Sequence, residues 1–185
     1  MQQALQKSQF VVTLVGGIFL PNQPLPPLPL HPVDRRAGLR DYPVMEKIIY
    51  PRSPREMMSG WVYLPRFVDK IRLHLAGKLH ADYQENLTKG FDGAWLKAAG
   101  VEAQTVMDVV KNSITDGQVA DWIAKNVNKT EADKSAFRDF ILNRGRDDEA
   151  IKARLIMRKK EAGLEHRDDI QTFVDFIDAD EKRLV

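Results

Sequence analysis

Apolar residues recur at alternating intervals of three and four along one stretch of the chain. They are Met57, Trp61, Leu64, Val68, Ile71 and Leu75. An α-helix repeats about every 3.6 residues, so this spacing gathers them on one helical face, whereas a half-buried strand would alternate. Ser53-Pro54-Arg55-Glu56 has the residues of a helix start: a cap, a proline and an acid. We therefore predict a helix from about Ser53, with a kink or break near Trp61–Leu64, where Pro65 interrupts the pattern, and an end at Gly77.

Six further helices are predicted downstream from similar spacing and from capping residues. The first three cover residues 94–99, 102–111 and 116–127. The fourth is capped by Thr130 and Asp133 and ends at Gly145, and the fifth begins at Asp147-Asp148-Glu149 and ends at Gly163. The last begins at about Asp168. Before these lies a polar loop, residues 78–93, which has no sustained period. The predicted fold class is all-α: a compact multi-helix single domain over residues 45–185, with one long polar loop and an unstructured N-terminal extension.

The first 44 residues have a different composition from the rest. An apolar run of eleven residues, 10–20, is shorter than the roughly 20 residues that span a bilayer. It is followed by PNQPLPPLPLHP, in which six prolines favour polyproline II over helix. Three interpretations stay open: a start assigned too far upstream of a true start at Met45, a membrane-directed or secretory leader, and a disordered proline-rich extension.

Composition excludes several classes of function. The chain has no cysteine, which excludes disulfides, thiolate zinc sites, iron–sulfur clusters and cysteine nucleophiles. The net charge of +2 lies within the first 44 residues, and residues 45–185 carry 24 charges of each sign. We therefore expect no nucleic-acid partner, no membrane partner unless the 10–20 run is a real leader, and a cytoplasmic location. The best-marked nucleotide-binding and hydrolase motifs do not occur in the sequence.

Polar residues that could form a site gather in two segments, residues 72–92 and 165–169. The candidates for binding a ligand are Arg72, Lys78, Asp82, Tyr83, Glu85, Asn86 and Arg167. The candidates for proton transfer are His74, His80, His166 and Asp168. On a helical wheel, Arg72 and His74 border the apolar stripe, where they either cover the edge of the core or face a cleft. His80, Asp82 and Glu85 could ligate a cation, but their spacing fixes no geometry, so we expect a hydrogen-bonded structural loop and no metal.

Two hypotheses of different classes follow, and whether the chain is an enzyme stays open. The favoured one is a non-enzymatic helical module that binds a protein or a small polar ligand, and it predicts an exposed apolar patch or groove. The alternative is a small enzyme acting on a polar or phosphorylated metabolite, in which Arg72, Lys78 and Arg167 hold an anion while a histidine transfers protons. This alternative predicts that the loop 78–93 and the turn 165–169 meet at one cleft. The sequence identifies no cofactor.

Two long segments of the chain are distinctive. They are Pro51–Val101 (PRSPREMMSGWVYLPRFVDKIRLHLAGKLHADYQENLTKGFDGAWLKAAGV) and Met157–Glu181 (MRKKEAGLEHRDDIQTFVDFIDADE). Both resemble the bacterial family catalogued as domain of unknown function 5069, and the resemblance extends over essentially all of residues 45–185. It implies a small, soluble, mostly helical bacterial protein that begins near the P-R-S-P element. It implies no reaction and no catalytic residue.

Overall fold

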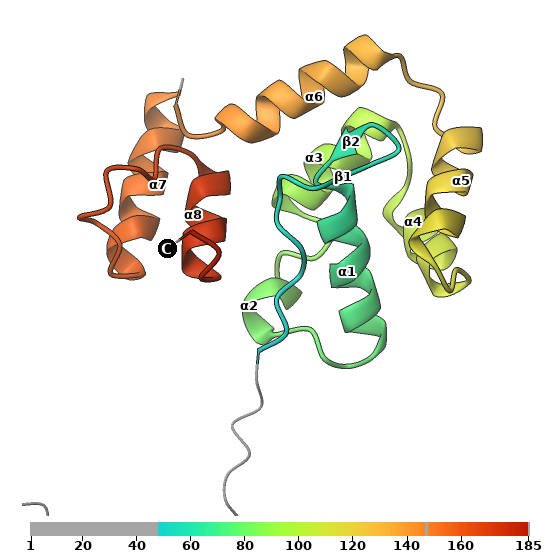
Figure 1. The fold of residues 1–185 in the computed structure, drawn as a ribbon, viewed down its shortest axis with the longest axis horizontal. Helices are drawn as coiled ribbons and strands as arrows, with labels where there is room; N and C mark the ends of the chain where they lie inside the picture. The colour runs from blue at the N-terminus through green and yellow to red at the C-terminus, as the bar shows by residue number, and fades with distance from the viewer. Residues whose placement is uncertain (1–47, 147, 185) are drawn as a thin grey trace, which may run out of the picture. The chain divides into compact units, whose positions relative to one another are not determined.

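The described part of the chain folds into eight helices and one short hairpin. The structure, a computed structural model, describes residues 48–146 and 148–184. In chain order the elements are β1 (Met57–Met58), β2 (Trp61–Val62), α1 (Leu64–Leu75), α2 (Ala81–Gln84), α3 (Gly90–Ala99), α4 (Ala103–Lys111), α5 (Asp116–Asn126), α6 (Glu131–Asn143), α7 (Glu149–Glu161) and α8 (Phe173–Asp180) (Figure 1). The prediction of an all-α fold is confirmed, since the described sheet has only two strands of two residues each.

The predicted N-terminal extension, residues 1–44, lies outside the described residues, and so does the apolar run within it. Its three interpretations therefore stay predictions. None of the described helices is long and apolar enough to cross a bilayer.

The predicted helix start at Ser53 is wrong. The chain turns at residues 54 and 55 and then forms the antiparallel hairpin, in which Met57 pairs with Val62 and Met58 with Trp61. Ser59 and Gly60 form its two-residue turn with φ values of 50° and 79°, as the favoured hairpin turns require. Helix α1 begins only at Leu64, and Pro65 occupies its first turn, where a proline is tolerated. The proline that was expected to break the helix therefore lies where the helix begins.

The buried face of α1 agrees with the predicted stripe except at its end. Leu64, Phe67, Val68 and Ile71 are fully buried, whereas Leu75 is 47% exposed. The helix stops there, and Gly77 follows with a φ of +65°, in the left-handed region that commonly ends helices.

The predicted continuous loop over residues 78–93 is interrupted by two helices. Short α2 lies within it, capped by His80, and α3 begins at Gly90, four residues earlier than the predicted start at 94. Apolar spacing could not predict α2, because none of its four residues is buried.

Helices α4 to α7 agree with the predicted ranges to within about two residues, whereas α8 does not. The predicted start at Asp168 is wrong, because α8 begins at Phe173 behind a capping box of Thr172 and Asp175. The Phe173 N–H donates to the Arg144 carbonyl across 2.9 Å, which fixes where the helix can begin.

The core is built around a group of aromatic rings. Trp61 of the hairpin lies edge-on to Trp95 of α3 and Phe137 of α6, with ring centroids 5.8 and 5.6 Å apart. Helix α6 contacts β2, α3 and α8, so it connects the main core to the pair α7–α8 (Figure 1). That pair has its own small apolar cluster, which includes Leu155 and Phe176. Helix α1 also contacts α4, and α4 contacts α5, so these two helices extend the main core.

Candidate functional site

Asp92, near the start of α3, is a fully buried carboxylate that accepts three hydrogen bonds. Lys70 Nζ donates across 2.5 Å, Tyr63 Oη across 2.7 Å and the Thr88 N–H across 2.9 Å. Burial raises the pKa of Tyr63 well above its ordinary value, and the charge of Asp92 adds to that effect. Burial also lowers the pKa of Lys70, although Asp92 acts against it. The cluster therefore fastens the segment before α3 to α1 with polar groups that pair with one another.

Glu181, just after α8, is the centre of a second buried cluster. Arg66 donates to its two oxygens across 2.9 and 2.5 Å, Tyr83 Oη donates across 2.5 Å, and Arg183 adds a further ion pair. Burial alone would raise the pKa of Glu181, but the hydrogen bonds and the charge of Arg66 lower it below its ordinary value. Burial and the bond to Glu181 raise the pKa of Tyr83. The loop 78–93 thus meets the C-terminal segment through Tyr83.

A third, partly exposed set of charges joins α1 to α5. Arg52 donates to both oxygens of Asp69 across 2.8 Å and to Asp116 across 2.7 Å. Arg72, on α1, donates to the other oxygen of Asp116 across 2.6 Å. Burial acts to raise the pKa of Asp116, but the two guanidinium groups lower it. A small hollow of about 210 Å³ beside Arg72 is lined by Ile49, Tyr50, Asp69, Arg72 and Leu73. The predicted ligand-binding residue Arg72 is therefore held by a carboxylate of the chain itself.

No hydrogen bond, ion pair or ring contact among the described residues joins any two of the three candidate histidines. His74 is exposed near the end of α1, and His166 is exposed in the connection between α7 and α8. His80 Nδ1 accepts the Asp82 N–H across 3.4 Å as the cap of α2, and its ring lies 6.5 Å from the ring of Tyr83. Its role in the structure is that of a helix cap.

The remaining candidate residues lie mostly at the surface. Lys78, Asp82, Glu85, Asn86 and Asp168 are all exposed. Arg167 forms a two-point pair with Asp169, with bonds of 2.8 and 2.7 Å. Within residues 48–146 and 148–184, no three His, Asp or Glu side chains are arranged to hold a metal ion.

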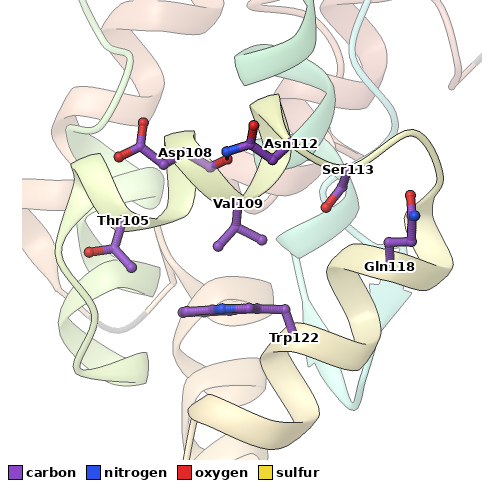
Figure 2. Close-up of a pocket in the computed structure, with 7 residues that line it drawn as sticks. All are labelled: Thr105, Asp108, Val109, Asn112, Ser113, Gln118 and Trp122. Carbon is purple, nitrogen blue, oxygen red and sulfur yellow. Dashed lines mark hydrogen bonds between the residues drawn. The ribbon is translucent and has the colours of Figure 1, made fainter.

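An open groove of about 400 Å³ lies between α4 and α5. Its lining residues are Thr105, Asp108, Val109, Asn112, Ser113, Gln118 and Trp122. Figure 2 shows Val109 pointing from α4 towards the flat face of the Trp122 ring on α5, with Ser113 and Gln118 at the end where the two helices connect. The floor of the groove is thus apolar, and its edges carry hydroxyl, amide and carboxylate groups.

The spacing of residues on α4 and α5 explains this groove. Helix α4 buries Val106 and Val110, which leaves Thr105, Val109 and Asn112 on the adjoining face at intervals of four and three. Helix α5 likewise buries Val119 and Ile123, which leaves Gln118 and Trp122 on its adjoining face. The two faces lie next to each other because α4 and α5 are in contact across a short connection.

Internal hydrogen bonds hold the edge groups of the groove in place. Asn112 Nδ2 donates to the Asp108 carbonyl across 2.8 Å. Gln118 Oε1 accepts the N–H groups of Ile114 and Thr115 across 2.7 and 3.1 Å, as part of the capping box of α5. These bonds orient the amide groups of Asn112 and Gln118 at the edge of the groove.

Sequence reasoning did not single out Trp122 or Val109. Each lies inside a predicted amphipathic helix, where an apolar residue is expected to be buried. The sequence contains one indication that Trp122 is not a core residue: on a helical wheel it lies beside the face formed by Val119 and Ile123 rather than within it.

Comparison with known families gives one match. The model of a family described as "Domain of unknown function (DUF5069)" matches residues 48–183, a range that includes every described helix and strand. No curated protein matches the chain.

Proposed function

The chain belongs to the family described as a domain of unknown function (DUF5069), and from its own geometry we propose that it is a binding module that recognises a protein segment in the groove between α4 and α5. One observation carries this proposal. Trp122 and Val109 form an apolar floor that opens to solvent between edges able to form hydrogen bonds. Binding sites typically combine such a floor with a few fixed polar groups.

The buried polar clusters support a structural role for the charged residues of the chain. All of the donors on Asp92 and Glu181 come from the chain, and both carboxylates are almost fully buried. A catalytic carboxylate needs contact with a substrate, whereas these two are occupied by their own partners.

The chemistry of the groove favours an apolar side chain carried on a peptide backbone. The ring face of Trp122 offers apolar contact area, and tryptophan is enriched among residues that dominate binding energy at interfaces. The amide of Asn112 and the hydroxyl groups of Thr105 and Ser113 are placed to bind backbone N–H and C=O groups. A volume of about 400 Å³ is within the range of small-molecule sites and accommodates one or two side chains.

Capped tripeptide amides of the form Ala-X-Ala test this proposal. Saturation-transfer NMR, which detects weak ligands, is run at millimolar peptide with isoleucine, phenylalanine, glutamate or lysine at X. The proposal expects transfer to the apolar peptides and little or none to the charged ones. A Thr105→Arg variant, whose longer side chain fills the groove from an exposed position on α4, should abolish the transfer.

The matched control is Ala153→Arg, which places the same side chain on an exposed position of α7, far along the chain from the groove. It should bind like the unmodified protein. Equal transfer to all four peptides, or transfer that survives Thr105→Arg, would show that the groove is not the recognition site.

A further inference from the structure

Ile114 is the most exposed large apolar residue among those described, at 89% exposure. It lies at the end of the groove, because it directly follows the lining residue Ser113 and its N–H donates across 2.7 Å to the lining residue Gln118. The capping box of α5 fixes this turn, so the Ile114 side chain projects from a rigid backbone. One surface therefore carries both an apolar projection and an apolar hollow.

We propose that the occupant of the groove is a second copy of this chain, which inserts its Ile114 against Trp122 and Val109. The first copy inserts its own Ile114 into the groove of the second in the same way. This inference rests on the proposed function and names the partner of that site. When a two-fold axis relates two copies, the projecting side chain of each copy can fill the hollow of the other. Two-fold symmetry is the commonest symmetry of soluble oligomers.

The charges around the groove fit this arrangement. The exposed charged residues of α4 are Asp108 and Lys111, and those of α5 are Asp121 and Lys125. Each helix thus contributes one acid and one base to this surface, so the surface carries no net charge that would repel its own copy across a two-fold axis. A patch with equal numbers of each sign can pack on itself without opposing like charges.

Helix α7 offers a comparison, because its exposed acidic and basic residues are not equal in number. It also exposes apolar residues, Ile156 at 60% and Met157 at 52%. Its exposed bases, however, outnumber its acids: they are Lys152, Arg154, Arg158 and Lys160 against Glu149 and Glu161. Two copies of that surface would repel each other, so it is not the self-association surface.

Sedimentation velocity on the full chain, from micromolar to millimolar concentration, tests the proposal. We expect a reversible monomer–dimer equilibrium. Burial of one isoleucine changes an association constant by roughly ten- to a hundredfold, and the dimer buries two. Ile114→Asp should therefore weaken association by about a hundredfold or more without unfolding the protein, because residue 114 is almost fully exposed. Ile156→Asp, the matched control on α7, should associate like the unmodified chain.

Two results overturn the dimer: a chain that stays monomeric throughout, or association that Ile114→Asp leaves unchanged. If the tripeptides still bind the groove in either case, only the identity of the occupant is wrong. If they do not bind, the proposed function fails as well.

Discussion

Arg66 and Glu181 form a two-point ion pair in which both side chains are at most 3% exposed, although 115 residues separate them in the sequence. Arg66 also donates to the carbonyls of Pro51 and Arg52. The pair therefore fastens the segment before the hairpin, the first long helix and the C-terminal segment to one another.

Removal of one partner of this pair should be costly. Glu181→Ala is expected to lower the free energy of unfolding by about 3–5 kcal/mol, because the Arg66 guanidinium stays buried without its counter-charge. The double variant Arg66→Met/Glu181→Leu should recover much of the loss, because it leaves no buried charge unpaired: Arg183, the other partner of Glu181, is partly exposed and keeps its ion pair with Asp178. Urea denaturation followed by circular dichroism measures both. Glu161→Ala, which breaks an exposed pair with Arg158, serves as the control and should cost less than about 1 kcal/mol.

A loss for Glu181→Ala no larger than that of Glu161→Ala would contradict the structural role assigned to the buried pair. So would a double variant less stable than Glu181→Ala alone.

The lowered pKa of Glu181 also predicts how stability depends on pH. Its value in the folded state lies below the ordinary value of 4.5, so the unfolded chain binds more protons in that interval. The contribution of Glu181 to stability is thus fully present above pH 4.5 and is lost as the pH falls through the folded-state pKa. We expect the free energy of unfolding to fall with pH in this window and the fall to become shallower in Glu181→Gln. Urea midpoints measured at a series of acidic pH values give the slope.

Asp180 provides the matched control, because its pKa is shifted in the opposite direction. Burial raises it, and the charges of Glu181 and Asp82 add to that effect. Ionised Asp180 therefore opposes folding, and Asp180→Asn should leave an acid-side slope at least as steep as that of the unmodified protein. A shallower slope in Asp180→Asn than in Glu181→Gln would contradict this assignment.

The cap of α8 can be tested by two alanine variants. Thr172→Ala removes the hydroxyl that accepts the Asp175 N–H across 3.1 Å and should cost about 1–2 kcal/mol. Asp168→Ala changes an exposed residue at the start predicted from the sequence and should stay within about 0.5 kcal/mol. Thermal or urea unfolding compares them. A larger loss for Asp168→Ala would mean that the helix begins where the sequence pattern placed it.

Gly145 joins α6 to the α7–α8 pair in a conformation that other residues rarely adopt. Its φ is +115°, and an added Cβ would meet Leu155 Cδ2 at 3.1 Å. Gly145→Ala should therefore cost about 1–3 kcal/mol. Gly163, with a φ of +69° and open space around it, is the control: Gly163→Ala carries backbone strain alone and should cost less. Equal losses of unfolding free energy in the two variants would show that the contact with Leu155 does not destabilise Gly145→Ala.

Local signals in the sequence were sufficient for most helices. The cap at Thr130 with Asp133 depends only on neighbouring residues, and so does the end of the predicted helix 94–99 at Gly100. The structure has both. Apolar spacing failed at the hairpin, because Met57 and Trp61, which lie in its two strands, also fit the helical spacing of three and four. Asp168 and Thr172 can each cap a helix. In the structure the helix follows Thr172, where the Phe173 N–H donates to the Arg144 carbonyl, a contact that local sequence does not show.

The groove could not be predicted for a related reason. Val109 and Trp122 each read as residues of an amphipathic helix, and only the packing of α4 on α5 turns their faces towards one another. The buried partners of Asp92 and Glu181 are separated from them by up to 115 residues. No spacing rule relates residues so far apart, and a polar residue that is buried with a partner looks in the sequence like one that is exposed.

The three tryptophans of the chain allow the most direct test of the recognition site. In a nitrogen-15 correlation spectrum each indole N–H gives one signal, and Trp61 and Trp95 act as internal controls because both are 0% exposed. Addition of the Ala-Ile-Ala amide should shift the Trp122 signal and leave the other two in place. An unmoved Trp122 signal, or equal shifts of all three, would contradict recognition at the groove between α4 and α5.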